Sequence, residues 1–134
     1  RDYPKAEQLF RESLAIQRQL HGNSQPEIAV SLFNLGAMLV TRQNYREAKP
    51  LLEEAVKIFH DGKTTNHRDY PRLLLSHARA NWGLGLYKAA DDAYSEAIPL
   101  LEKQLGAGHT SVAAARRQQK ELQERARGER SHKP

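Results

Sequence analysis

Three tyrosines, Tyr3, Tyr45 and Tyr87, stand 42 residues apart along the chain. An alanine follows each tyrosine three residues later, and further positions in the same register match in size and polarity. The matching sets are Ala6, Ala48 and Ala90; Ser13, Ala55 and Ala97; Leu14, Val56 and Ile98; and Ile16, Ile58 and Leu100. A fixed period of this length is typical of chains built from stacked repeats, each one a small supersecondary unit.

The segments that follow the tyrosines carry apolar residues at helical spacing. In the middle segment Ala48, Leu52, Ala55 and Phe59 recur every three to four residues, as on one face of an amphipathic helix. We expect Gly62 to end this helix in the left-handed conformation. No segment shows the sustained alternation of a strand. The sequence therefore predicts an all-α chain with helices near 4–20, 26–42, 45–60, 70–84, 87–105 and 110–127.

The stretch from Leu32 to Gly36, followed by Tyr45 and Ala48, resembles a tetratricopeptide repeat. The 42-residue period and the linkers 20–29 and 105–113 are similar to those of kinesin light chain and nephrocystin-type repeats. This resemblance implies a right-handed superhelix of antiparallel helix pairs. In that architecture the first helix of each pair lines a concave groove that holds a peptide or a helix of a partner protein.

On this basis we expect one domain over residues 1–127. Residues 1–22 form the second helix of a truncated repeat, 23–64 and 65–106 form two repeats, and 107–127 form a capping helix. Residues 128–134 are expected to be a flexible tail. Because the chain begins at Arg1, inside a repeat, we expect a fragment of a longer protein.

The resemblance also implies which side chains face the groove. Arginine binds carboxylates through paired hydrogen bonds and tryptophan often anchors bound chains, so we expect a ligand with acidic residues. Asn34 and Arg72 match two members of the carboxylate clamp of some tetratricopeptide domains, whereas Ser76 replaces a basic member. An alternative is that Trp82 packs within its own helix pair and that the arginines are solvated. The candidate groove residues are Phe33, Asn34, Ala37, Val40, Arg72, Leu75, Ser76, Arg79 and Trp82.

The helix near 70–84 has an unusual packing face. His77 and Asn81 stand one period after Leu35 and Leu39, where the repeat pattern has apolar residues. A single histidine on such a face is more often a core residue with satisfied hydrogen bonds than a ligand-binding group.

The first helix lacks the partner helix that its repeat would supply. Its apolar residues Leu9, Phe10, Leu14 and Ile16 are therefore candidates for an exposed terminal interface. Self-association through this helix is the main alternative to peptide binding.

The basic charge is concentrated at the end of the chain. Residues 116–134 carry 7 Lys and Arg against 3 Asp and Glu, whereas residues 1–115 carry 14 against 13. Attachment to nucleic acid through this segment is a second alternative. The charges alternate with Glu and Gln and have no aromatic residues among them on which bases could stack, which favours a solvated helix face.

Catalytic and metal-binding motifs are absent from the sequence. There is no cysteine, no HExxH, no Gly-x-Ser-x-Gly and no phosphate-binding Gly-Lys-Ser/Thr loop. The chain also lacks the roughly 20 consecutive apolar residues of a membrane span. We therefore expect a cytoplasmic, non-enzymatic binding protein without metal or cofactor.

Overall fold

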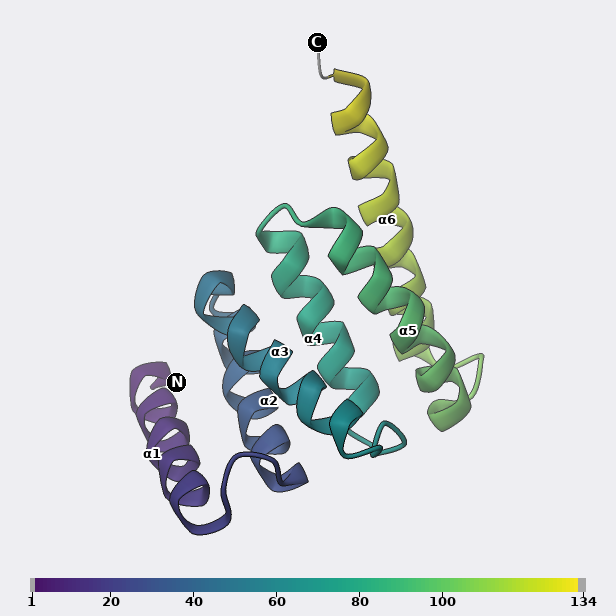
Figure 1. Cartoon of the computed structure of the whole chain (residues 1–134). Coiled ribbons are helices and arrows are strands. Elements are labelled where there is room, and N and C mark those ends of the chain that lie inside the picture. Colours follow the sequence, from purple (N-terminus) through teal and green to yellow (C-terminus); the bar gives the residue numbers. More distant parts are fainter. Residues whose placement is uncertain (1, 133–134) are drawn as a thin grey trace.

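The computed structural model describes residues 2–132, with side chains up to Glu129. The described residues form six helices and no strand, which confirms the all-α prediction (Figure 1). The helices are α1 (Tyr3–His21), α2 (Pro26–Thr41), α3 (Tyr45–Asp61), α4 (Tyr70–Gly83), α5 (Tyr87–Leu105) and α6 (Thr110–His132). Apart from the end of α6, each boundary lies within one residue of its predicted position.

Local side chains fix where the helices begin. Asp2 accepts a hydrogen bond from the backbone N–H of Lys5 at 3.1 Å, and Asn44 accepts one from Glu47 at 3.5 Å. These carboxylate and amide oxygens satisfy donors that the first helical turn leaves open. At the end of α3 the prediction for Gly62 was wrong, because its φ is −81° and Lys63 takes the left-handed conformation instead, with φ of 55°.

The helices stack side by side from α1 to α6, with α2 packed on α3 and α4 on α5 (Figure 1). The repeating alanines Ala48, Ala55 and Ala97 have no exposed surface. Close packing is tight at Gly83, where a Cβ atom would lie 2.2 Å from Tyr45 Cδ2, and at Gly36, where it would lie 2.5 Å from Leu52 Cδ2. Small residues are therefore required in these columns because the helix backbones approach one another closely there.

Helix α6 packs one face against α5 and extends beyond the rest of the stack (Figure 1). Its residues Val112, Ala115 and Leu122 are buried. The expected flexible tail is corrected in part, because residues 128–132 belong to α6 and residues 133–134 lie outside the described residues. One contact near its end holds the helix, since the Tyr87 hydroxyl donates a hydrogen bond to Glu129 at 2.7 Å.

Helix α1 presents a narrower apolar surface than the sequence predicts. Leu14 is buried and Phe10 is half-buried against the core, so neither is exposed as expected. Leu9 and Ile16 are each 57% exposed, and Leu20, which we did not predict, is 70% exposed. Helical periodicity explains the split, because residues 10 and 14 share the side that packs on α2 whereas 9, 16 and 20 share another.

Candidate functional site

One recess lies between the first helices of the repeats and has a volume of about 530 Å³. Helix α4 supplies its polar groups, while α2, α5 and α6 supply mostly apolar or small side chains. Its lining residues are Phe33, Arg72, Leu75, Ser76, Arg79, Leu101, Leu105, His109, Ser111, Ala114 and Ala115.

A second recess adjoins the first at Arg79, which lines both. The other residues that line it are Val40, Thr41, Gln43, Tyr45, Trp82, Gly83, Tyr87 and Arg125. Trp82 is half-buried against the core, and the Arg125 guanidinium lies 6.0 Å from the centre of its ring. Together the two recesses form an elongated surface with an apolar floor and three arginines, which we call the groove.

Seven of the nine predicted groove residues line these recesses. The two that do not are Asn34, which is exposed, and Ala37, which is half-buried. The structure therefore does not bring Asn34 into the recess that holds Arg72, and the partial carboxylate clamp is not assembled. Leu75 and Ser76 are almost fully buried, so they contribute shape more than accessible contact area.

The prediction missed the wall that α6 contributes. Ala114 stands one period after Arg72, and Arg125 stands one period after Gly83. The 42-residue register was therefore the signal that could have placed both residues. The polar composition of α6 concealed it, since we interpreted this helix only as a solvated cap.

Arg72 and Arg79 form no ion pair with any described residue, although both are exposed. Five other arginines pair with carboxylates: Arg11, Arg18, Arg42, Arg116 and Arg125. Beside Arg79, burial raises the pKa of the Tyr94 hydroxyl, and the charge of Arg79 offsets part of that effect. Tyr94 also donates a hydrogen bond to Gln118 at 3.1 Å. Arg79 also donates a hydrogen bond to the Tyr94 hydroxyl. Since neither guanidinium group is held by a carboxylate of the described residues, both can bind one from outside.

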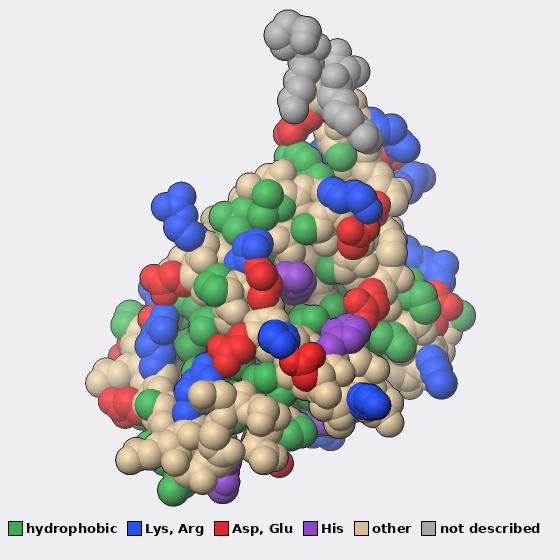
Figure 2. Space-filling view, in the orientation of Figure 1, with side chains coloured by type: hydrophobic (Ala, Val, Ile, Leu, Met, Phe, Trp, Pro, Cys, Tyr) green, Lys and Arg blue, Asp and Glu red, His purple; other side chains and the backbone are tan. Residues whose placement is uncertain are grey.

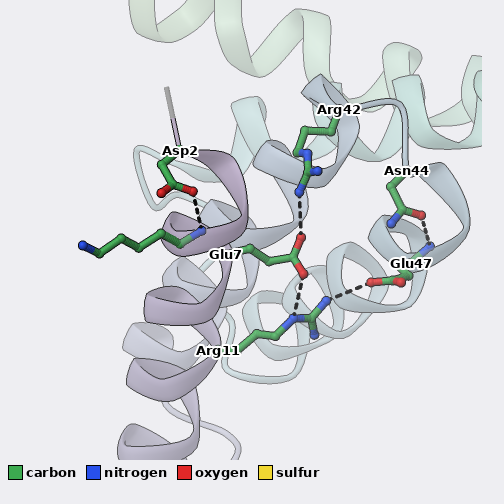
Figure 3. Close-up of polar contacts among 7 residues, drawn as sticks. Asp2, Glu7, Arg11, Arg42, Asn44 and Glu47 are labelled. Carbon is green, nitrogen blue, oxygen red and sulfur yellow. Dashed lines mark hydrogen bonds and ion pairs between the residues drawn. The ribbon is translucent and has the colours of Figure 1, made fainter.

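On another face of the molecule, α1 and α3 are joined by ion pairs. Arg11 donates to Glu7 at 3.2 Å and to Glu47 at 2.8 Å, and Arg42 approaches Glu7 at 3.3 Å (Figure 3). In the last turn of α1, Arg18 donates two hydrogen bonds of 2.8 Å to Glu54 on α3.

The polar pair on α4 lies in a different environment from the groove. Asn81 has no exposed surface, and its amide nitrogen donates to the backbone oxygen of His77 at 3.0 Å. The Asn81 side-chain oxygen accepts no hydrogen bond from any described residue. Leaving such an acceptor buried and unpaired costs about 1–3 kcal/mol. Asn81 therefore lowers the stability of this packing face relative to the leucine one period earlier.

His77 gives the stability of the fold a specific pH dependence. Burial lowers the pKa of His77; the carboxylates of Glu53 and Glu96 oppose this shift, and Lys49 reinforces it. Because the unfolded chain then binds more protons than the folded one, stability is full above the unfolded pKa and falls as pH drops below about 6.5. We expect His77→Leu to remove this component. Urea unfolding at pH 8 and pH 5 should show a smaller loss for the variant than for the wild type, and equal losses would contradict it.

Neither a metal site nor a membrane-spanning helix is found among the described residues. No group of three or more His, Cys, Asp or Glu among them is arranged to hold a metal ion. None of the described helices combines the length and the apolar character that crossing a bilayer requires.

Comparison with known proteins now identifies the fold. A sequence profile described as tetratricopeptide repeat matches residues 1–60. A crystal structure described as the Q17M form of "kinesin light chain nearly identical TPR-like repeats" from Podospora anserina superposes on 94% of this chain with a TM-score of 0.67. Residues 1–60 thus match the tetratricopeptide-repeat family, and the chain as a whole has the fold of such repeats. Domains of this family generally serve as scaffolds for protein–protein interaction.

The structural match shows the fold alone, since the two sequences are 22% identical. The chain spans 66% of the length of that structure. Among curated protein sequences, none matches this chain. The ligand of this chain therefore depends on the residues of its own groove.

Proposed function

We propose that this domain is a non-enzymatic scaffold whose groove binds an extended peptide or a helix of a partner protein. The observation that carries the proposal is that two arginines without a carboxylate partner lie beside an apolar floor. Arg72 and Arg79 border a recess whose floor includes Phe33, Leu75 and Leu105. A ligand with carboxylates beside a large apolar residue satisfies both features.

The second recess supplies an anchor for the same ligand. Trp82 is half-buried, so one part of its indole packs on the core while another part lines the recess. Half-exposed aromatic residues in grooves are frequent hot spots of binding energy. We propose that an apolar ligand side chain packs against Trp82 while the acidic residues pair with Arg72 and Arg79. No cofactor or metal takes part, and we place this interaction in the cytoplasm.

Selection from a random peptide library displayed on phage tests the proposal. We expect enriched peptides to carry two or more Asp or Glu next to an aromatic or large aliphatic residue. Their affinity should fall only moderately between 50 and 300 mM salt, because residues 1–115 are nearly neutral overall. Enrichment of basic peptides, or no enrichment, would contradict the proposal.

Self-association through α1 is a second candidate function, favoured by the exposure of Leu9, Ile16 and Leu20. If α1 mediates self-association, the average mass measured by light scattering should rise with protein concentration. The Leu9→Glu/Ile16→Glu variant should remain monomeric, since charges on this surface oppose burial. Glu12→Gln, at an exposed residue of the same helix, is the control and should associate like the wild type. A wild type that stays monomeric at all concentrations would remove this candidate.

Attachment to nucleic acid receives less support from the geometry. Arg116 pairs with Glu102, and Arg125 pairs with Glu121 at 3.6 Å and lies over Trp82. These cations are thus partly neutralised within the chain, and we do not propose this function.

A further inference from the structure

The 42-residue period relates two troughs that lie between the second helices of neighbouring repeats. The first trough lies between α1 and α3, and the second lies between α3 and α5. In the first, Arg11 reaches from α1 to Glu47 on α3 at 2.8 Å while it also pairs with Glu7 (Figure 3). The floor of the first trough is formed by Leu35 and Leu39 of α2, which are fully buried. The first trough is therefore closed by a guanidinium group.

The second trough lacks this closure. One period after Arg11 and Glu47 stand Glu53 and Ala89, which cannot form an ion pair. The trough remains open as a recess of about 550 Å³. Its lining residues are Lys49, Glu53, His77, Asn81, Leu86, Tyr87, Lys88, Ala89 and Asp92.

The second trough also differs in its floor. His77 and Asn81 replace the two leucines of the first trough, and both line the recess. The Asn81 side-chain oxygen accepts no hydrogen bond from any described residue, although the side chain is fully buried. If this contact between helices had only a structural role, an apolar floor would be more stable than one with an unpaired acceptor. The unpaired oxygen of Asn81 therefore points to a hydrogen-bond donor that a ligand supplies.

Carboxylates stand on both walls of the second trough. Glu53 on α3 pairs with Lys49, and Asp92 on α5 pairs with Lys88 at 2.7 Å. Both pairs join residues of the same helix, so neither bridges the trough. In Figure 2 histidine side chains lie among acidic and basic ones in the middle of this face. Exposed pairs of this kind contribute little to stability and exchange readily for a stronger partner.

We propose that the second trough binds the guanidinium group of an arginine side chain from a partner protein. In the first trough Arg11 lies between two such helices, which shows that this space admits a guanidinium group. Lys49 and Ala89 stand where Glu7 and Glu47 hold Arg11, so the acceptors of the second trough are different residues. The planar fork of a guanidinium presents five donors, enough for Glu53, Asp92 and the Asn81 oxygen together. The terminal torsion of asparagine is broad, so the Asn81 amide can turn towards a bound donor. This site meets the groove only at Tyr87, which lines both, and none of the three proposed acceptors lines the groove.

Titration with Nα-acetyl-arginine methylamide, followed by ¹⁵N NMR, tests the site. We expect saturable shifts of the Asn81 side-chain amide and of the Ala89 and Asp92 backbone amides, with a dissociation constant of about 1 mM. The matched probe Nα-acetyl-citrulline methylamide, which has the same shape without charge, should give at least tenfold weaker binding. Equal binding of both probes, or shifts confined to the groove, would overturn the proposal.

Two variants separate binding from folding. His77→Leu/Asn81→Leu copies the floor of the first trough, so it should fold with unchanged or raised stability and lose at least tenfold in affinity for the arginine probe. Ala89→Glu restores the acceptor that Glu47 provides in the first trough and should bind the probe at least threefold more tightly. Unchanged affinity in both variants would contradict the proposal. Arg72→Gln/Arg79→Gln should bind the probe like the wild type, so a failure of the groove proposal would be distinguishable.

Discussion

Phe59→Ala is expected to destabilise the domain by about 3–5 kcal/mol, because the side chain is fully buried and its removal leaves a cavity in the core. The ring packs edge-on against Tyr70, with centroids 5.7 Å apart, and lies 5.0 Å from the ring of His67. These contacts join the end of α3 to the linker and to the start of α4. Since a domain of this size has a total stability of about 5–15 kcal/mol, we expect a clearly lowered urea midpoint.

Phe33→Ala is the matched control for this prediction. The same atoms are removed, but Phe33 is half-buried and lines the groove. We expect a loss of only about 1–2 kcal/mol, in proportion to the smaller area withdrawn from water. Equal destabilisation by the two substitutions would show that Phe33 belongs to the core and would argue against an apolar groove floor.

Arg72→Gln/Arg79→Gln is expected to weaken binding of a selected acidic peptide by about 30-fold or more. An exposed ion pair contributes up to about 1 kcal/mol, so the loss of two such pairs corresponds to about 2 kcal/mol. Fluorescence anisotropy with a labelled peptide measures the change. The substitution keeps a polar amide but removes the charge and the five-donor fork, so the loss reports the guanidinium groups.

Arg46→Gln is the control for the groove variant, because Arg46 is an exposed arginine on α3 that does not line the groove. We expect its affinity to lie within twofold of the wild type. If Arg46→Gln weakens binding as much as the double variant does, the peptide responds to overall charge and the assignment of Arg72 and Arg79 is wrong.

The helices were predictable because their signals are local. Pro26 and Pro71 in first helical turns, and the spacing of Ala48, Leu52 and Phe59, fix boundaries and faces without reference to the rest of the chain. The end of α6 was not predictable in this way. Residues 128–132 have no apolar pattern, and the Tyr87 contact to Glu129 joins residues 42 positions apart.

The candidate sites depend on packing between helices, which the sequence encodes only indirectly. Leu9 and Leu14 look alike in the sequence, and only the position of α2 decides that one is exposed and the other buried. The open second trough depends likewise on two helices at once. Arg11 and Glu47 form an ion pair across the first trough, whereas Glu53 and Ala89 stand at the matching positions of the second. The replacement of Leu39 by Asn81 was visible in the sequence, but its unpaired oxygen was not.

The measurement that tests the central claim most directly is a ¹⁵N NMR titration of this domain with a selected acidic peptide. If the groove binds the partner, the largest shifts fall on residues of α2, α4 and α6 that line it, with Phe33, Arg79 and Ala114 among them. The Trp82 indole N–H should shift as well, since it reports the second recess. Shifts that are concentrated instead on α1, or on the trough between α3 and α5, would contradict the assignment of the groove as the peptide-binding site.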